Sequence, residues 1–349
     1  MACVSDDSYT PLPSTVSRCL PLGGQELQNM TDEPNSYDFL YSAYRLERGF
    51  PVYAMDIPNP DYDSVLASYV DHSGGADLIW DAVKQEAKLE AEKEPILNSF
   101  LYANILSHDR LEQALAFVLA NRLQNPTLLA TQLTEIFFDV MMHDKGIQRS
   151  IRLDLQAFID WDPACLSYCF ALLYMKGYCS LQVHRVAHAL WGQGCQVLAS
   201  ALQSRVSEVF GVDIHSAAKI GEGILLDHGT GVVIGETAII RKRVSLMHGV
   251  TLGGSMKEIG DPHPKIGDGV FIGASATILG NIGIGKGAII AACSLLLKEV
   301  SPHSIVAGIP ANVIGYLHEL DPSLTMKHDA TKDYFNHVAA HYRDGKSTS

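Results

Sequence analysis

Hydrophobic residues in the C-terminal half of the chain recur at a step of six residues. The aliphatic residues that keep this step are Ile214, Ile220, Leu226, Ile234, Ile240, Leu246, Leu252, Ile266, Ile272, Ile278, Ile284, Ile290 and Leu296. A six-residue period fits neither an amphipathic helix nor a simple sheet meander, but it is typical of a parallel β-helix. We therefore expect each six-residue segment to form one side of a triangular coil, with its aliphatic side chain pointing into a stacked core.

The period is interrupted twice, and both interruptions contain a histidine and an aspartate. The step lengthens between Leu226 and Ile234, and again between Leu252 and Ile266. Insertions of this kind leave a stacked core intact and form loops, where repeat proteins usually carry their function. The pattern therefore places the candidate chemistry on these two loops.

Before residue 211 the hydrophobic pattern has the 3.6-residue period of amphipathic helices. Helices are expected from Ala76, from Pro95, and over about 109–124, 126–143, 146–159, 163–175, 179–192 and 194–209. Asp109, Asn125 and Asp162 are the predicted N-caps, and a proline follows two of them, as is common in a first helical turn. Gly211 marks the change to the six-residue period.

These patterns divide the chain into four parts. They are an irregular or disordered extension rich in Pro, Ser, Asp and Tyr (1–75), an α-helical domain (76–210), a β-helix domain (211–316) and a polar tail (317–349). The end coils of a β-helix need covering, so we expect the helix before Gly211 to cap one end and the chain after Pro310 to cover the other. The flat coil faces also suit packing against symmetric copies, which predicts a homo-oligomer.

Composition narrows the class of protein. The chain has 349 residues, of which 47% are hydrophobic, enough for two domains with real cores. Its net charge of −13 argues against a nucleic-acid partner, and no apolar stretch is long enough to predict a membrane span. The seven cysteines show no CxxC pair and the first residues no secretory pattern, so we expect reduced thiols and a cytoplasmic location.

Asp213 and His228 are candidates for general-base chemistry. Asp213 stands fifteen residues before His228 and is expected on the preceding coil, so the two side chains could approach each other across the stack. A histidine that donates its far ring N–H to a carboxylate has a fixed tautomer and a raised basicity, as a base acting on a hydroxyl requires. The alternative is a corner histidine that only bonds the backbone. His263, between two prolines, could likewise belong to loop architecture, and His248 is interpreted as a structural corner residue.

Other motifs are weaker. His184 and His188 stand at i and i+4 on a predicted helix but lack the glutamate of the metalloprotease motif, so zinc is not expected. The glycines of residues 283–287 are in phase with the six-residue turns, which favours turns over a phosphate-binding loop. The basic run 241–243 is interpreted as a solvated corner.

Four segments together resemble the motifs of the serine O-acetyltransferase family. They are Val212-Asp213-Ile214-His215 and the residues 223–231, 234–238 and 260–265. The helical part, through residues 94–97, 162–164 and 184–191, is similar to the plant-like branch of the family, and the likeness covers roughly 76–318. The resemblance implies a fold in which a helical domain is followed by a left-handed parallel β-helix. It also implies a function, that of an acyltransferase in cysteine biosynthesis. The left-handed coil is implied by the resemblance alone, since the general preference of parallel crossovers would predict the opposite hand.

Position by position, the resemblance implies direct transfer of acetyl from acetyl-CoA to L-serine. It makes His228 the general base and Asp213 the residue that orients it, and it assigns Asp162 and Asp227 to the serine ammonium and His263 to the carboxylate. Acetyl-CoA would lie between neighbouring β-helices of a trimer or dimer of trimers, beside Gly254, Lys257, Ala274 and Ala292. Such a transfer needs a base and an oxyanion donor, so we expect neither a metal nor another cofactor.

Two positions depart from the family pattern. Pro262 stands where the family usually has an arginine that clamps the serine carboxylate, and Met256 replaces a glycine. Loss of a charge-assisted pair costs about 1.5–3 kcal/mol, so we expect an enzyme of low activity unless Lys257 or Arg241 substitutes. Two alternatives stay open: transfer to another small hydroxyl or amine acceptor, and a nearly inactive regulatory or scaffolding subunit. The intact Asp213 and His228 favour an enzyme.

The C-terminus bears on a protein partner. The family commonly binds O-acetylserine sulfhydrylase through a tail that ends in an aliphatic residue, usually isoleucine, whereas this chain ends in Ser349. Serine supplies almost no apolar area, and burying an isoleucine is worth roughly 1.5–3 kcal/mol. We therefore expect weak or absent complex formation through this tail.

Overall fold

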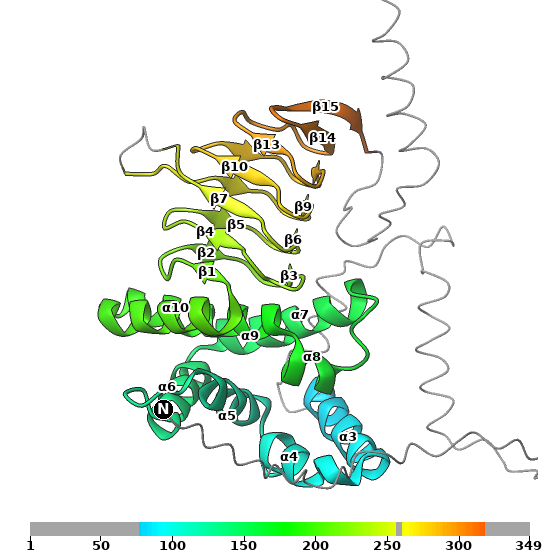
Figure 1. Cartoon of the computed structure of the whole chain (residues 1–349), viewed down its shortest axis with the longest axis vertical. Coiled ribbons are helices and arrows are strands. Elements are labelled where there is room, and N and C mark those ends of the chain that lie inside the picture. The colour runs from blue at the N-terminus through cyan, green and yellow to red at the C-terminus, as the bar shows by residue number, and fades with distance from the viewer. Residues whose placement is uncertain (1–76, 256–259, 318–349) are drawn as a thin grey trace, which may run out of the picture. The chain divides into compact units, whose positions relative to one another are not determined.

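The computed structural model describes residues 77–255 and 260–317. Its N-terminal part is helical, as the 3.6-residue period predicts (Figure 1). The elements are α3 (Leu78–Lys93), η2 (Pro95–Leu97), α4 (Asn98–Leu101), η3 (Tyr102–Leu106), α5 (Leu111–Leu123), α6 (Ala130–His143), α7 (Lys145–Trp161), α8 (Tyr168–Tyr174), α9 (Lys176–Gly192) and α10 (Gln196–Phe210). The N-terminal extension, residues 256–259 and the tail with Ser349 lie outside the described residues.

The predicted N-caps are wrong in detail. Arg110, not Asp109, is the residue before α5. Asn125 accepts from the N–H groups of Thr127 and Leu128 and closes a turn, so α6 begins only at Ala130. Asp162 ends α7 and accepts from the N–H of Ala164 instead of starting the next helix. Asn and Asp side chains close short turns as readily as they cap helices, which a sequence pattern does not distinguish.

The side chains that do cap helices are Asp77, Asp144 and Ser167. Each accepts hydrogen bonds from the first-turn N–H groups of α3, α7 or α8. These donors have no partner within the helix itself, so a short oxygen-bearing side chain before the first turn satisfies them.

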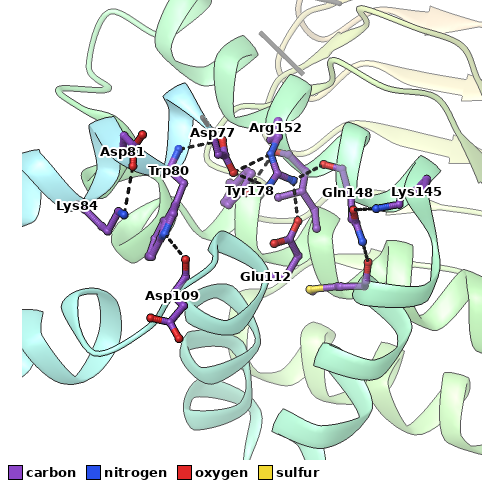
Figure 2. A network of polar contacts seen from close by, with 12 residues as sticks. Asp77, Trp80, Asp81, Lys84, Asp109, Glu112, Lys145, Gln148, Arg152 and Tyr178 are labelled. Atoms are coloured by element: carbon purple, nitrogen blue, oxygen red, sulfur yellow. Dashed lines mark hydrogen bonds and ion pairs between the residues drawn. The ribbon is translucent and has the colours of Figure 1, made fainter. Parts of the chain in front are cut away.

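A buried ion-pair network joins three of the helices (Figure 2). The guanidinium of Arg152 on α7 donates to Asp77 Oδ2 at 2.6 Å and to Glu112 Oε1 on α5 at 2.7 Å. Asp77 also caps α3, where the ring N–H of Trp80 donates to the carbonyl oxygen of Asp109. The Arg152 side chain is only 4% exposed, so its charge needs both carboxylates, and the network ties the start of α3 to the helical core.

After Gly211 the chain forms stacked coils of short parallel strands (Figure 1). The strands are β1 (Asp213–Ile214), β2 (Lys219–Ile220), β3 (Leu225–Leu226), β4 (Val233–Ile234), β5 (Ile239–Ile240), β6 (Ser245–Leu246), β7 (Thr251–Gly253), β8 (Lys265–Ile266), β9 (Phe271–Ile272), β10 (Thr277–Leu279), β11 (Gly283–Ile284), β12 (Ile289–Ile290), β13 (Leu295–Leu296), β14 (Ser304–Gly308) and β15 (Ala311–Tyr316). They make three ladders, ordered β1-β4-β7-β10-β13, β11-β8-β5-β2 and β15-β14-β12-β9-β6-β3.

The register of the ladders confirms the six-residue pattern. Ile214 pairs with Ile234, and Ile234 with Leu252, so each predicted inward residue stacks on its counterpart one coil away. All of these aliphatic residues are buried except Ile220, which is partly buried. A continuous column of apolar side chains therefore fills the coil, as stacked repeats require.

Both ends of the coil stack are covered. The long helix α10 packs against β1 and ends at Gly211, whose φ of 70° is the left-handed conformation that suits a glycine after a helix. At the other end, β15 runs antiparallel to β14. The segment after Pro310 therefore extends one of the three ladders at that end.

A buried pair fixes the first coil to the helices. Arg185 on α9 donates to both oxygens of Asp154 on α7, and also to the carbonyl oxygen of Gly221. Asp154 in turn accepts from the N–H of Ile224. Asp154 is fully buried, so its partners on both sides hold residues 221–224 in one position.

Over the ranges that the structure describes, none of the helices combines the length and the apolar character that crossing a bilayer requires.

Candidate active site

His228 lies in a tight turn between β3 and β4. Its φ is 54°, and the φ of Gly229 and Gly231 are 70° and 74°. This left-handed conformation is uncommon for a residue with a side chain and persists only where the surroundings hold it. The turn directs the imidazole outward, with 70% of the side chain exposed, so the ring is accessible to a substrate.

The N-terminal end of α9 supports this turn. A Cβ atom at Gly177 would lie 1.8 Å from the carbonyl oxygen of Leu226, and one at Gly229 would lie 3.3 Å from the Cα of Gly177. The ammonium of Lys176 contacts the hydroxyl of Thr230. The helix backbone therefore packs directly on the residues on either side of His228.

Two carboxylates converge next to His228. Asp227 precedes it, and Asp162 is buried at the end of α7. Burial raises the pKa of the Asp227 carboxyl and the nearby Asp162 carboxylate adds to that rise, while the positive character of His228 and His248 opposes it. A carboxylate whose pKa is raised in this way by a neighbouring carboxylate favours a cation near it.

Asp213 lies at the start of β1, beside the strand that follows the His228 turn, because it pairs with Val233. Its carboxylate accepts a hydrogen bond from Gln203 on α10 at 2.9 Å. The carboxylate that the structure places nearest the His228 ring is Asp227, whose Oδ1 lies 3.8 Å from Nε2. The hydrogen bond between Asp213 and His228 that the sequence pattern predicts is therefore not formed in this structure, where the side-chain partner of Asp213 is Gln203.

His248, which the sequence pattern suggests is a structural corner residue, lies beside His228. Its ring lies edge-on to that of His228, with the centroids 6.1 Å apart. The strand register explains why the two histidines are neighbours. Leu226 pairs with Leu246, and each histidine follows its leucine by two positions. The same corner of successive coils therefore carries two imidazoles.

His263 is held in the second loop as a neutral ring. Its Nδ1 accepts from the N–H of Thr237 at 3.2 Å and lies 2.9 Å from that residue's hydroxyl oxygen. Partial burial lowers the pKa of His263, and the charge of Lys265 lowers it further. The network therefore assigns the ring proton to Nε2. A Cβ atom at Gly235 would lie 2.0 Å from Nε2, so only glycine fits beside it.

Hydrogen bonds from Lys265 hold the segment around His263 in place. Its ammonium donates to Asp261 Oδ1 at 2.6 Å, to the carbonyl oxygen of His263 at 2.7 Å and to that of Thr237 at 2.8 Å. Pro262 packs near Gly254, whose added Cβ would come within 3.2 Å of the proline ring. Gly254 thus belongs to this loop, whereas Met256 and Lys257 lie outside the described residues.

Ala274 and Ala292 follow β9 and β12, which are neighbours in one ladder. The N–H of Cys293 donates to the carbonyl oxygen of Ala274 at 2.8 Å, and a Cβ at Gly273 would lie 2.6 Å from the backbone nitrogen of Ala292. These two predicted residues therefore stack at one corner on adjacent coils.

The helical His184 and His188 do not resemble a metal site. Their rings lie 5.9 Å apart, but burial lowers the pKa of His184 to about 3, and His188 Nδ1 bonds the carbonyl oxygen of Ser216. Among the described residues there is no group of three or more His, Cys, Asp or Glu side chains arranged to hold a metal ion.

Stacked six-residue coils with histidines and carboxylates on their loops define an acyltransferase of the hexapeptide-repeat class. A family model described as "Serine acetyltransferase, N-terminal" matches residues 79–183, and one described as "Bacterial transferase hexapeptide (six repeats)" matches residues 263–298.

The chain is also similar to whole proteins: "Serine acetyltransferase 4" of Arabidopsis thaliana is 60% identical over 99% of this chain and 95% of its own length. "Serine acetyltransferase 2" of the same plant is 66% identical over 86% and 92%.

Solved structures agree. "Soybean Serine Acetyltransferase Complexed with Serine" matches with a TM-score of 0.66 and 52% identity, over 67% of this chain and 97% of that one. The Brucella abortus serine acetyltransferase in complex with coenzyme A matches with a TM-score of 0.68 and 45% identity, over 69% and 96%. The chain belongs to the serine acetyltransferase family. The predicted fold class, a helical region followed by a left-handed parallel β-helix, is confirmed.

Proposed function

We propose that this protein transfers the acetyl group of acetyl-CoA to the hydroxyl of L-serine and so makes O-acetyl-L-serine for cysteine biosynthesis. The observation that carries the proposal is the exposed His228 imidazole, held in a rigid turn between the acidic pair Asp162 and Asp227 and a second imidazole, His248. A base, a cation-binding pair and a further hydrogen-bond donor are the groups that this reaction needs.

In the proposed mechanism His228 acts as the general base. Its neutral imidazole takes the proton of the serine hydroxyl while the oxygen attacks the thioester carbonyl. The tetrahedral oxyanion then collapses, the carbon–sulfur bond breaks, and the imidazolium returns the proton to the leaving thiolate. Asp213 orients the ring and stabilises its charged form. His248, on the next coil, is positioned to donate to the oxyanion.

Serine binding follows from the charges of the two loops. The carboxylates of Asp162 and Asp227 hold the ammonium, which relieves their mutual repulsion. His263 offers its Nε2–H to the carboxylate as a neutral donor. Pro262 adds neither charge nor donor, so we propose weak serine binding and an enzyme of low activity, unless Lys257 or Arg241 takes the place of a clamp.

Acetyl-CoA is proposed to lie beside Gly254, Lys257, Ala274 and Ala292, in the groove between two β-helices of a homo-oligomer, a trimer or a dimer of trimers. The small residues Ala274 and Ala292, stacked on adjacent coils, support this assignment, because a small side chain obstructs a bound molecule less than a large one. We also propose the domain limits 76–210 and 211–316, between which the helical period gives way to the six-residue period. A cytoplasmic location stays a prediction, since one relative is named "Serine acetyltransferase 3, mitochondrial".

An assay of thiol release from acetyl-CoA across a panel of acceptors tests the proposed function. We expect L-serine to stimulate release more than other small alcohols and amines. Preference for an acceptor without a carboxylate would favour the alternative transferase, which the proline at position 262 permits. No stimulation by any acceptor would leave a regulatory or scaffolding subunit.

Replacing the base is the sharpest mutational test. His228→Ala and His228→Asn are expected to lower turnover roughly 10²–10⁴-fold, with little change in the KM of acetyl-CoA, because the base acts on the acceptor. Asp213→Asn should give a smaller but clear loss, since it leaves a misoriented base. Near-normal turnover in either His228 variant would refute the assignment.

A further inference from the structure

Gln203, on α10, makes a hydrogen bond to the carboxylate that is proposed to orient the catalytic base. Its side-chain nitrogen donates to Asp213 Oδ1 at 2.9 Å. The two residues lie on different elements, α10 and β1, and the chain turns between them at Gly211. A side chain from the helical domain thus reaches the first coil at the position of Asp213.

The orientation of the Gln203 amide is fixed by its other end. Its Oε1 accepts from the backbone N–H of Ser216 at 3.1 Å. Exchanging the amide oxygen and nitrogen would set two donors against each other at Ser216 and two acceptors against each other at Asp213, so the NH₂ group must face the carboxylate.

The frame around this amide is rigid. Ser216 is completely buried, and its hydroxyl donates to the carbonyl oxygen of Ala199, one turn before Gln203 on the same helix. The guanidinium of Arg205 donates to the carbonyl oxygens of Leu123 and Gln124 at the end of α5. The helix that carries Gln203 is therefore bonded both to α5, through Arg205, and to the first coil, through Ser216.

We propose that Gln203 is a positioning residue for acetyl transfer, holding one oxygen of Asp213 so that the other is free to accept from the His228 imidazole. The inference rests on the proposed role of Asp213 as the partner of the base. A hydrogen bond from an amide fixes the plane of the carboxylate, so that its second oxygen keeps one direction toward the imidazole.

A double-mutant cycle tests this role. In the wild-type background, Gln203→Leu is expected to lower kcat/KM for serine about 10- to 100-fold, the worth of a hydrogen bond to a charged group. The KM of acetyl-CoA should change little, whereas the thermal midpoint should fall, because the backbone N–H of buried Ser216 loses its acceptor. In an Asp213→Ala background the same substitution should cost almost nothing further, because Gln203 acts through Asp213. Gln196→Leu, at the exposed start of the same helix, is the matched control and should be silent.

Gln203→Glu gives a second readout that a merely structural role would not produce. The glutamate keeps the shape of the Gln203 side chain and an acceptor for the N–H of Ser216. It loses the NH₂ group that donates to Asp213, and it adds a negative charge beside Asp213 and His228. That charge favours the protonated, inactive imidazole, so the rising limb of kcat/KM against pH should move up by about one pH unit. The other charged and titratable groups around the ring, Asp162, Asp227 and His248, are unchanged in this variant.

The outcomes separate the inference from the proposed function. The positioning role is wrong if Asp213→Ala loses activity while Gln203→Leu retains it. It is also wrong if the losses of the two variants are fully additive. In both cases the pairing of Asp213 with His228 still stands. If Asp213→Ala retains full activity, that pairing itself is wrong and the inference falls with it. Should Gln203→Leu fail to fold, an unshifted pH profile for a folded Gln203→Glu variant overturns the role.

Discussion

The neutral ring of His263 shows how single residues set the character of the acceptor site. Its Nδ1 is occupied by Thr237, and both burial and the charge of Lys265 lower its pKa. A neutral N–H donor binds a carboxylate more weakly than a charged fork would. Pro262, the preceding residue, adds neither a charge nor a hydrogen-bond donor to this weaker contact.

Restoring a charge at position 262 is therefore a direct test of serine recognition. Pro262→Arg is expected to lower the KM of serine about 10- to 100-fold, the equivalent of a charge-assisted pair. Turnover at saturation should change much less, because a clamp on a non-reacting carboxylate binds ground and transition states alike.

The matched control for that experiment is Pro262→Gln, which also removes the proline ring but adds no charge. Equal effects of the two substitutions would show that release of the proline, not the guanidinium, is responsible. Unchanged serine kinetics in Pro262→Arg would mean that the loop presents position 262 elsewhere or that serine is not the acceptor.

Glu86 on α3 is a second residue whose charge state has consequences. It is largely buried and accepts from the N–H of Cys169 at the start of α8. Burial raises its pKa from 4.5 to about 7, with hydrogen bonds from Cys169 and Tyr168 opposing the rise. Below pH 4.5 the carboxyl is protonated in both folded and unfolded chains. Between 4.5 and about 7 only the unfolded chain loses the proton, so stability falls as pH rises.

Glu86→Gln should remove this dependence. We expect the free energy of unfolding of the wild type to drop by roughly 1–3 kcal/mol more than that of the variant between pH 5 and pH 8. Chemical denaturation at both pH values measures the difference. The exposed Glu92→Gln on the same helix is the control and should follow the wild type, and a parallel fall in the Glu86 variant would contradict the assignment.

At the scale of the elements, α9 acts as the support of the His228 turn. Its first residues pack against Leu226 and Gly229, and further along the same helix Arg185 holds the first coil through Gly221. One helix thus fixes both the coil and the loop that leaves it. The left-handed turn at His228 is therefore packed against this helix, and an uncommon backbone conformation persists where its surroundings hold it.

Gly177→Ala tests that support. An added methyl would overlap the carbonyl oxygen of Leu226, so we expect a loss of roughly 1–3 kcal/mol in stability together with reduced turnover. Alanine normally stabilises a helix relative to glycine, which makes a loss informative.

Gly192→Ala, on the same helix with open space around it, is the control for Gly177 and should be neutral or slightly stabilising. Thermal denaturation and serine kinetics measure both variants. A stable and fully active Gly177→Ala protein would show that α9 does not constrain the loop.

At the scale of the whole molecule, the C-terminal residue bears on complex formation with O-acetylserine sulfhydrylase. In a peptide that ends at Ser349, this residue supplies a carboxylate but lacks the apolar side chain that a pocket for isoleucine requires. We expect the C-terminal ten-residue peptide to bind that enzyme weakly or not at all in calorimetry. Ser349→Ile should gain about one to two decades of affinity. Tight binding by the unmodified peptide would falsify the prediction.

The sequence by itself determined the features that depend on a local repeat. The six-residue step placed the inward side chains Ile234, Leu252 and Ile278 and marked both loops, because stacking forces the same residue type onto every coil. Loop motifs around His228 and His263 were sufficient to indicate the family. These signals are local in the chain, so they need no knowledge of the remaining fold.

Only the tertiary structure decided the contacts between distant segments. His248 faces His228 because Leu226 and Leu246 are in register, and Gln203 reaches Asp213 because α10 packs against β1. The wrong helix-cap predictions have a different, local origin, since Asn125 and Asp162 each accept from a backbone N–H two or three residues later and so close a turn. The contacts of His248 and Gln203, in contrast, depend on how the segments are brought together in space, which the order of hydrophobic residues alone does not specify.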